Sequence, residues 1–361
     1  MSKRVLICHR DGERLIALTD EGALLSLCQD RPGIQAEQIY LARVDRMVKG
    51  MEAAFVKLDQ DTVGFLPYAE CREKPRSGEK LLLQVKKPPV GDKAAYMTED
   101  AALAGRYVIL TPRSENVAVS RKIMDEGQRA ALLSLGRQIV PEGMGLVMRT
   151  EAAEAAQDAL ILEVEGLQAK WQAILSKAES AQAPCLLSDR EDALQRLMRD
   201  EHGKILEILT DEPEEEIENA SIPVRLCPDA FSIYSVDRQW EKARQRRVWL
   251  PCGGYLVIDK TEALTVIDVN SGKFTGGKSG AEGTFLKLNL EAAKEIARQM
   301  RLRSMGGIII CDFVDMQEES SQRQVRSALE EALRDDPVKC VVHGFTSLGL
   351  MEITRKKTQA P

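Results

Sequence analysis

The sequence predicts an α/β protein that also contains a small β-barrel. Residues 36–100 hold several short strand-length runs broken by frequent turns, a pattern typical of a closed barrel. Residues 244–361 alternate apolar strands with amphipathic helices, which predicts a layered α/β unit. The chain has 361 residues, more than one ordinary domain holds, so we expect two or more domains.

The composition indicates a soluble cytoplasmic protein. No apolar run reaches the length of a membrane span, and the N-terminus lacks a signal-peptide core. None of the eight cysteines forms a CxxC pair, which predicts reduced thiols and no zinc motif. With only three histidines, a histidine-based metal centre is not expected. The net charge of −6 means that any nucleic acid must bind through local basic patches.

The N-terminal segment, residues 1–35, is too short to form a domain. It holds two short strand candidates, "RVLICH" and "RLIALTD", separated by the turn "RDGE". We therefore expect these strands to pair with a later part of the chain.

The predicted barrel contains the hairpin "FVKLDQDTVGFLP", which places Phe55 and Phe65 on facing strands. One interpretation is that both rings belong to the core. The other is that they stack on bases while Lys86, Lys87 and Lys93 contact a nucleic-acid backbone. Spacing alone leaves both interpretations open.

In the middle of the chain, the sequence pattern changes from short strands to a long helix. Residues 101–185 begin with strand-like runs and continue into a long amphipathic helix that Pro184 terminates. Its apolar face steps by four, three, four and three residues through Leu160, Val164, Leu167, Trp171 and Ile174. Residues 186–243 are helical and acidic, and "DEPEEEIENA" is typical of a solvated charge run or linker.

The C-terminal part predicts strands and helices in alternation. "VWLPCGGYLVID" and "ALTVIDVNSG" indicate a hairpin, and a helix follows over residues 288–305. "IIICDF" is predicted to be a buried strand, and a further helix and the strand "KCVVHGF" complete the unit.

Two of these strands begin apolar and become acidic towards their carboxyl ends. Asp268 and Asn270 share a face of one strand, and Asp312 ends the other. If the strands are neighbours, two carboxylates and an amide oxygen can form a hard-oxygen Mg²⁺ site. The alternative is that each aspartate caps its strand or pairs with an arginine. Asp315 is a weaker candidate, because it lies three residues beyond Asp312.

The loop "SGKFTGGKSG" follows the first acidic strand. It offers Lys273 and Lys278 as phosphate contacts, since glycine-rich loops with lysine can bind phosphates. The spacing is not that of a P-loop, so the signal is weak.

Taken together, these segments resemble the ribonuclease E/G family of bacterial endoribonucleases. The resemblance is carried by "GYLVIDKTEALTVIDVNSGKFTGG", "NLEAAKEIARQMRLRSMGGIIICDFVDM" and "GLMEITRKK" in that order. "MEAAFVKLDQDTVGFLP" is similar to the family's inserted RNA-binding barrel, and "GMGLVMRT" to its 5′-sensor stretch. The resemblance covers essentially the whole chain.

The resemblance implies an architecture of four parts. Residues 1–35 and 195–243 would form a ribonuclease-H-like subdomain, interrupted by an OB-fold RNA-binding barrel at residues 36–100 and a 5′-sensor at residues 101–194. Residues 244–361 would form a deoxyribonuclease-I-like catalytic subdomain.

The resemblance also assigns roles to individual residues. The catalytic and metal-binding positions are Asp268 and Asp312, assisted by Asn270. The RNA contacts of the barrel are Phe55, Phe65 and Lys93. The positions that would bind a 5′-monophosphate are Arg149, Thr150, Gly105, Ile109 and Lys339. Lys339 stands where the family often has arginine, so the charge is kept but the forked geometry is lost, and 5′-end sensing should be weaker.

The expected activity is that of a Mg²⁺-dependent endoribonuclease acting on single-stranded RNA in RNA processing and decay. It would leave 5′-phosphate and 3′-hydroxyl ends, prefer 5′-monophosphorylated RNA, and accept Mn²⁺ as an alternative to Mg²⁺. The family's CxxC zinc link is absent before Pro361, so zinc is not supported, whether the chain is naturally short or truncated. A homodimer through the catalytic subdomain is the expected assembly.

Two other functions remain open. The chain could be an RNA-binding, 5′-end-sensing module that is inactive without further assembly. A metal-dependent deoxyribonuclease is the third interpretation.

Overall fold

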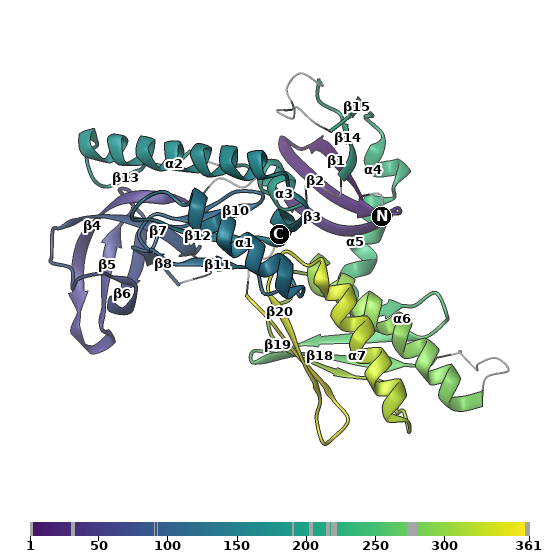
Figure 1. Ribbon diagram of the computed structural model, residues 1–361. Coiled ribbons are helices and arrows are strands. Elements are labelled where there is room, and N and C mark those ends of the chain that lie inside the picture. The colour runs from purple at the N-terminus through teal and green to yellow at the C-terminus, as the bar shows by residue number, and fades with distance from the viewer. Residues whose placement is uncertain are drawn as a thin grey trace. The chain divides into compact units, whose positions relative to one another are not determined.

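Figure 1 shows the computed structural model of the chain, which describes residues 3–29, 33–89, 91, 93–189, 191–201, 205–213, 217, 222–272 and 280–357. The chain folds into two compact units. The first unit joins residues 1–30 to residues 204–361, and the second comprises residues 31–203. Within the described ranges, each unit contains two sheets.

The first sheet of the first unit joins the two ends of its sequence. Its strand order is β15 (Val224–Leu226), β14 (Ile205–Thr210), β1 (Lys3–Arg10), β2 (Glu13–Asp20) and β3 (Ala23–Gln29). β1 pairs with β14 in parallel, so the N-terminal strands do join a later segment. Helices α4 (Ala230–Ile233) and α5 (Val236–Arg244) bury Phe231 and Val236 against this sheet.

The second sheet of this unit carries the two acidic strands. Its order is β16 (Arg247–Trp249), β17 (Tyr255–Lys260), β18 (Leu264–Asn270), β19 (Gly307–Asp312), β21 (Met351–Arg355) and β20 (Cys340–Phe345). β18 and β19 are parallel, and the other neighbours in this order are antiparallel. Helix α6 (Gly280–Leu302) connects the parallel pair, as such a pair requires a crossover.

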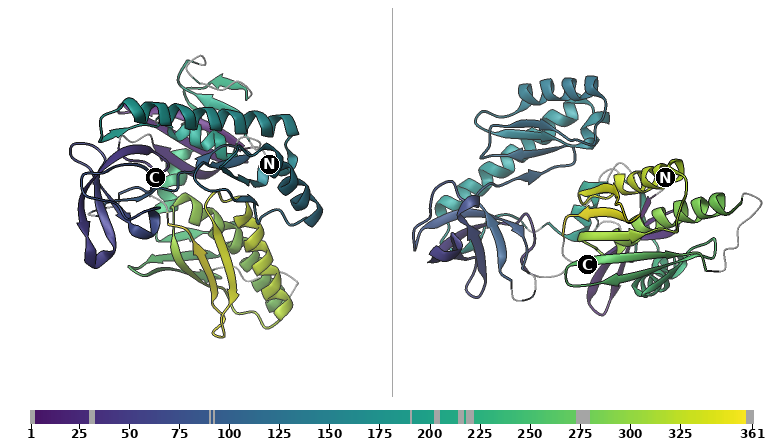
Figure 2. Two further views of the ribbon diagram at one scale, coloured as in Figure 1. Left: turned by 60° about the vertical axis from the view of Figure 1, so that its left-hand side comes forward. Right: turned by 90° about the horizontal axis from the view of Figure 1, so that it is seen from below.

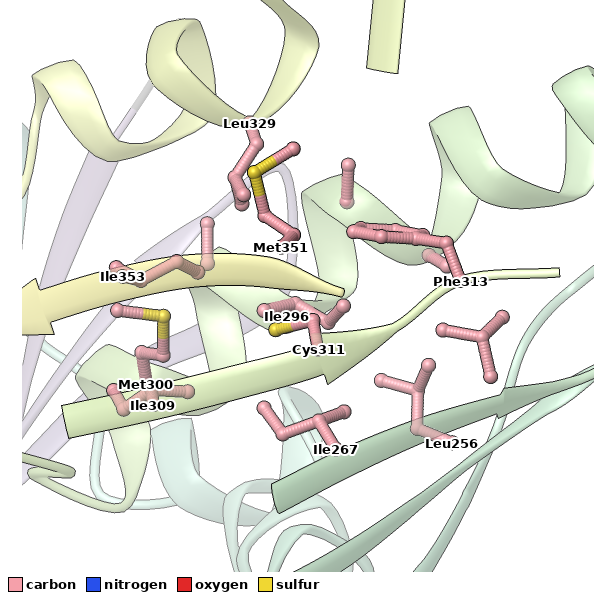
Figure 3. Close-up of a cluster of buried hydrophobic side chains, with 14 of the residues drawn as sticks. Leu256, Ile267, Ile296, Met300, Ile309, Cys311, Phe313, Leu329, Met351 and Ile353 are labelled. Atoms are coloured by element: carbon pink, nitrogen blue, oxygen red, sulfur yellow. The ribbon is translucent and has the colours of Figure 1, made fainter. Parts of the chain in front are cut away.

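Helices α6 and α7 (Glu319–Arg334) lie side by side, as Figure 2 shows, and pack on one face of this sheet. The core between helices and sheet is shown in Figure 3, where Ile296 of α6 and Leu329 of α7 meet Ile309, Cys311 and Met351 of the strands. These five side chains are fully buried. Burying such side chains is the main stabilising contribution of this layer.

The expectation that "IIICDF" is a buried strand is correct for one face only. Ile309 and Cys311 are fully buried, whereas Ile308 is 49% exposed. The reason is that both helices cover the same face, so alternate residues of each strand point to the other side. We call that other side the open face. It carries Asp268 and Asp312, which are both exposed.

The second unit begins with the predicted barrel. Its strands follow the order β4 (Ile39–Val48), β5 (Ala53–Lys57), β6 (Val63–Pro67), β8 (Ala95–Thr98) and β7 (Lys80–Lys87), and pairing of β7 with β4 closes it. β6 and β8 are parallel, and β13 (Cys185–Leu186) pairs with β4. The five-stranded closure leaves no free edge within the barrel.

The rest of the second unit is a small sheet with helices. Its strands follow the order β11 (Val117–Val119), β12 (Gly145–Met148), β10 (Val108–Thr111) and β9 (Leu103–Ala104), and the helices are α1 (Glu126–Ile139) and α2 (Gln157–Ser180). α2 buries the predicted apolar face from Leu160 to Ile174, so that prediction is confirmed. In the described part of the chain, no helix has the length and apolar character that crossing a membrane requires.

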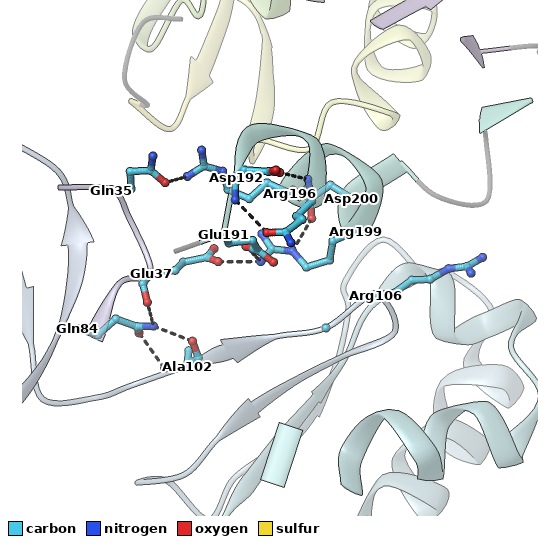
Figure 4. Close-up of polar contacts among 12 residues, drawn as sticks. Gln35, Glu37, Gln84, Ala102, Arg106, Glu191, Asp192, Arg196, Arg199 and Asp200 are labelled. Carbon is cyan, nitrogen blue, oxygen red and sulfur yellow. Dashed lines mark hydrogen bonds and ion pairs between the residues drawn. The ribbon is translucent and has the colours of Figure 1, made fainter. Parts of the chain in front are cut away.

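Helix α3 (Ala193–Glu201) is tied to the segment that precedes the barrel by the polar contacts in Figure 4. Arg199 donates to Glu37 at 2.9 Å and to Glu191 at 2.7 Å, and Arg196 donates to Gln35 at 2.7 Å. Arg199 is only 13% exposed, so its ion pairs are poorly screened by water. These contacts fix the position of Asp200, the neighbour of Arg199.

Candidate functional site

The two acidic strands are neighbours in the sheet, and their aspartates lie opposite each other. β18 and β19 pair in a register that runs from Leu264 against Ile308 to Asp268 against Asp312. Both aspartates therefore lie at the carboxyl ends of parallel strands, on the open face. Asn270 donates from Nδ2 to Asp268 Oδ2 at 2.7 Å, which fixes the orientation of that carboxylate. The structure thus brings together the three residues that the sequence singled out here.

The negative charges of the aspartates at this edge of the sheet are not balanced by positive side chains among the described residues. Among the described residues, neither Asp268 nor Asp312 makes an ion pair, so the alternative of arginine pairing finds no support there. Partial burial raises the pKa of the Asp312 carboxyl, and the negative charges of Asp268 and Asp315 raise it further. Asp315, the weaker candidate from sequence, is therefore close enough to act on Asp312. A cation bound between the carboxylates would relieve this repulsion.

The two carboxylates suit Mg²⁺ better than a metal ion that protein side chains alone must coordinate. Within the described ranges, no group of three or more His, Cys, Asp or Glu side chains is arranged to bind a metal. Mg²⁺ typically uses one or two carboxylates and completes its shell with water and substrate phosphates. Asp268 and Asp312 supply such a pair. Lys273 and Lys278, the candidate phosphate contacts, lie outside the described residues.

The barrel carries a row of aromatic rings flanked by cations. Phe55 and Phe65 are register partners with ring centroids 5.7 Å apart, so the prediction that they face each other is confirmed. Phe65 also lies 6.1 Å from Tyr96 of β8. The Arg46 guanidinium is 4.8 Å from the Phe55 ring, and the Lys87 ammonium is 5.3 Å from the Tyr96 ring. We call these five residues the barrel row.

The barrel row belongs to the surface and not to the core. Phe55 and Phe65 are half-buried, and the barrel core is built from other residues such as Val56, Leu66 and Leu83. Sequence reasoning missed Arg46 and Tyr96. Tyr96 joins the row only because β6 and β8 pair in parallel, a register that no local pattern reveals.

Two other lysines of the barrel, Lys93 and Lys86, differ in how available they are to a ligand. Lys93 is exposed, as a backbone contact would require. Lys86 forms an ion pair with Glu70 at 2.5 Å. Burial alone would raise the pKa of the Glu70 carboxyl, but its hydrogen bonds, led by that from Lys86, lower the pKa below its ordinary value. Lys86 is therefore less available for a ligand than Lys93 or Lys87.

The predicted 5′-phosphate residues of the second unit cluster around Arg149, which directly follows β12. Its guanidinium donates to the carbonyl of Gly105 at 2.5 Å and to Asp200 at 3.0 Å. The Thr150 hydroxyl lies 3.1 Å from the Ser120 hydroxyl. Sequence reasoning missed Asp200 and Ser120, because both come from elements that are distant in the sequence and lack a distinguishing motif.

Gly105 opens a tight loop held by a carboxylate of α2. Glu163 accepts from the backbone N–H groups of Arg106, Tyr107 and Val108 at 2.7, 2.7 and 2.9 Å. A Cβ at Gly105 would lie 2.5 Å from the Glu163 carboxyl carbon, so any larger residue here would displace the carboxylate that holds the loop. Ile109 follows on β10 and is half-buried. Lys339 is exposed and belongs to the first unit.

Comparison with known proteins gives a consistent result. The sequence model of the Ribonuclease E/G family matches residues 102–358. The chain is similar to ribonuclease E of Nostoc sp. (36% identity over 99% of this chain and 56% of the relative). It is also similar to ribonuclease G of Escherichia coli K12 (33%, over 99% and 81%) and ribonuclease E of the same strain (35%, over 98% and 37%). The chain thus spans about half or less of the ribonuclease E relatives.

The coupling between the two aspartates can be tested in the metal-free protein. We expect Asp268→Asn to lower the pKa of Asp312, because one of the negative charges that disfavour its ionisation is removed. Carbon NMR of the aspartate carboxyl groups during a pH titration measures this shift. Asp259→Asn is the control, since Asp259 is paired with Arg246 at 2.6 Å and should not affect Asp312. An unchanged Asp312 titration in Asp268→Asn would contradict the proximity.

Proposed function

We propose a function for this chain from the family to which it belongs, the ribonuclease E/G family. The comparisons confirm the resemblance read from the sequence. The chain is proposed to be an endoribonuclease that cuts single-stranded RNA with Mg²⁺, or with Mn²⁺ in its place. The observation that carries the proposal is the register of β18 and β19, which sets Asp268 opposite Asp312.

In the proposed reaction, Asp268 and Asp312 hold the metal. A bound Mg²⁺ would polarise the scissile phosphate and lower the pKa of a water, so that hydrolysis leaves 5′-phosphate and 3′-hydroxyl ends. Asn270 keeps the Asp268 carboxylate in place through its 2.7 Å hydrogen bond. Both carboxylates must be ionised to bind the cation, and the raised pKa of Asp312 means that this carboxyl takes up a proton at a higher pH than an ordinary aspartate does. Protonation of Asp312 on acidification would therefore weaken metal binding.

The barrel is proposed to hold the RNA strand. Its strand order, with β6 and β8 parallel and β7 closing on β4, supports the OB-type assignment. In the barrel row, Phe55, Phe65 and Tyr96 would stack on bases while Arg46 and Lys87 contact phosphates. Such contacts tolerate sequence but require unpaired bases, since bases in a duplex are already stacked.

The remaining parts of the architecture are proposed on the same basis. The sheet that joins β1–β3 to β14 and β15 would be the ribonuclease-H-like subdomain. The sheet from β16 to β21 with α6 and α7 would be the deoxyribonuclease-I-like catalytic subdomain, and the surface through which two copies assemble.

Arg149 and Thr150 are proposed to bind a 5′-monophosphate, with Gly105 and Ile109 beside it in the same unit. An arginine fork binds phosphate oxygens through charge-assisted hydrogen bonds, and a threonine hydroxyl adds one more. In the structure Asp200 occupies one arm of the fork. A phosphate would replace this carboxylate, so Asp200 would hold the arginine in position and compete with the ligand.

The metal site can be tested by neutralising each aspartate. We expect Asp268→Asn and Asp312→Asn to slow cleavage of single-stranded RNA by roughly a hundredfold or more, because the metal supplies several kcal/mol of charge stabilisation. RNA affinity measured in EDTA should stay unchanged, and Asp259→Asn should cleave normally. Undiminished cleavage in both variants would exclude the site. A wild-type chain that binds RNA but never cuts it would favour the alternative of a binding module.

The 5′-end pocket can be tested with paired substrates that carry a 5′-monophosphate or a 5′-hydroxyl. We expect Arg149→Ala to reduce the preference for the monophosphate by roughly ten- to a hundredfold, the range for hydrogen bonds to charged groups. Asp200→Asn should increase that preference by roughly two- to fivefold, because a partly exposed competing ion pair is lost. The measurement is the ratio of cleavage rates on the two substrates. A ratio that neither variant alters would contradict the pocket.

A further inference from the structure

The open face carries a second group of aromatic and cationic side chains, and the proposed reaction does not use it. Trp249 of β16 is 58% exposed, and its ring centroid lies 5.2 Å from that of Tyr255 on β17. The Arg247 guanidinium lies 4.4 Å from the Tyr255 centroid and 5.8 Å from the Trp249 centroid. We call these three residues the sheet cluster.

The sheet cluster lies on the same face of the sheet as the two aspartates and is in register with Asn270. Trp249 pairs with Tyr255, and Tyr255 pairs with Asn270, the residue that orients Asp268. Directly paired residues of neighbouring strands project to the same face, so the three side chains form a line across it. Neighbouring strands are about 4.8 Å apart, which puts Trp249 about 10 Å from Asn270. A few nucleotides of a single strand can span that distance.

Trp249 does not pack in the hydrophobic core, so a role in core packing does not explain the tryptophan at this position. Its neighbour Val248 enters the core, whereas the alternation of the strand turns Trp249 outwards. Trp171, by contrast, is 4% exposed and packs in the core of its unit. Exposed tryptophan is uncommon in globular proteins and enriched at binding surfaces.

The charge of the sheet cluster indicates what kind of molecule would cover it. Arg247 is exposed and, among the described residues, makes no ion pair, so its charge is available to a ligand. Arg246 next to it is paired with Asp259 and is not available in this way. Aromatic rings with an available cation are the elements of single-stranded nucleic-acid binding surfaces. A negatively charged strand with unstacked bases is complementary to both.

We propose that the sheet cluster is a base-stacking subsite for an unpaired nucleotide next to the scissile phosphate. Trp249, supported by Tyr255, stacks on the base, and Arg247 contacts a phosphate of the same strand. This proposal rests on the proposed function and adds a path for the RNA across β16, β17 and β18. It also adds a second reason for selecting single strands, because a paired base cannot reach the ring.

The test uses the full chain and a single-stranded RNA carrying one 5-iodouridine, bound in EDTA so that no cleavage occurs. Irradiation links iodouridine to an aromatic ring that stacks on it, and mass spectrometry locates the adduct. We expect adducts on Trp249 or Tyr255 in addition to those on the barrel row. Adducts confined to the barrel row would overturn the proposal.

Affinity provides a second readout. Trp249→Ala should weaken RNA binding by roughly five- to a hundredfold, the range for loss of one stacked base, and Trp249→Phe should restore most of it. Ile308→Ala is the matched control, since Ile308 is an exposed apolar residue on the same face without an aromatic ring. Equal affinity in Trp249→Ala and wild type would overturn the proposal.

Three outcomes distinguish the subsite from an interface between copies of the chain and from the proposed function itself. If Trp249→Ala changes the sedimentation of the protein without RNA and leaves RNA affinity intact, a second copy of the chain covers the cluster and the proposal is wrong. If the wild type never cleaves RNA but adducts form on Trp249, the proposed function fails and the binding surface stands. If the wild type cleaves and no such adduct forms, the subsite alone fails.

Discussion

The candidate site depends on one backbone interaction, the parallel pairing of β18 with β19. The hydrogen bonds between these strands set Asp268 opposite Asp312. A slip by one residue would turn one of the aspartates into the buried layer beneath α6 and α7, where an unpaired carboxylate is very costly. Burial of Ile267 against Ile309 and Cys311 on that side therefore holds the two carboxylates together on the other. The core fixes the register, and the register places the charges.

The same constraint explains why one face of the sheet carries the candidate site. Both helices pack on a single side, which leaves the alternate residues of each strand accessible. On the accessible side, partial burial raises the pKa of the Asp312 carboxyl, and the negative charges of Asp268 and Asp315 raise it further. The barrel row and the sheet cluster use the same physical elements, aromatic rings and available cations, on different sheets. If both surfaces bind RNA as proposed, an acidic protein would bind a polyanion through local basic and aromatic surfaces.

Sequence reasoning succeeded where a pattern is local. The apolar period of α2, the facing phenylalanines of the barrel hairpin and the acidic ends of two strands could all be predicted. It could not supply partners that meet only through pairing of distant segments. Tyr96 joins Phe65 through a parallel register, and Asp200 reaches Arg149 from a separate helix. Nothing in the local sequence distinguishes Trp249 from other strand residues. Only the strand order places it two strands from Asn270. The one-sided burial of "IIICDF" was missed because an apolar run does not reveal how many faces are covered.

Asp268 and Asp312 are proposed to bind one divalent cation between them. The most direct measurement is anomalous X-ray diffraction from crystals of the full chain soaked in Mn²⁺, which takes the same oxygen ligands as Mg²⁺. The result that agrees with the claim is an anomalous peak within coordination distance of both carboxylates, lost in Asp268→Asn. A peak elsewhere, with none between these two residues, would contradict it.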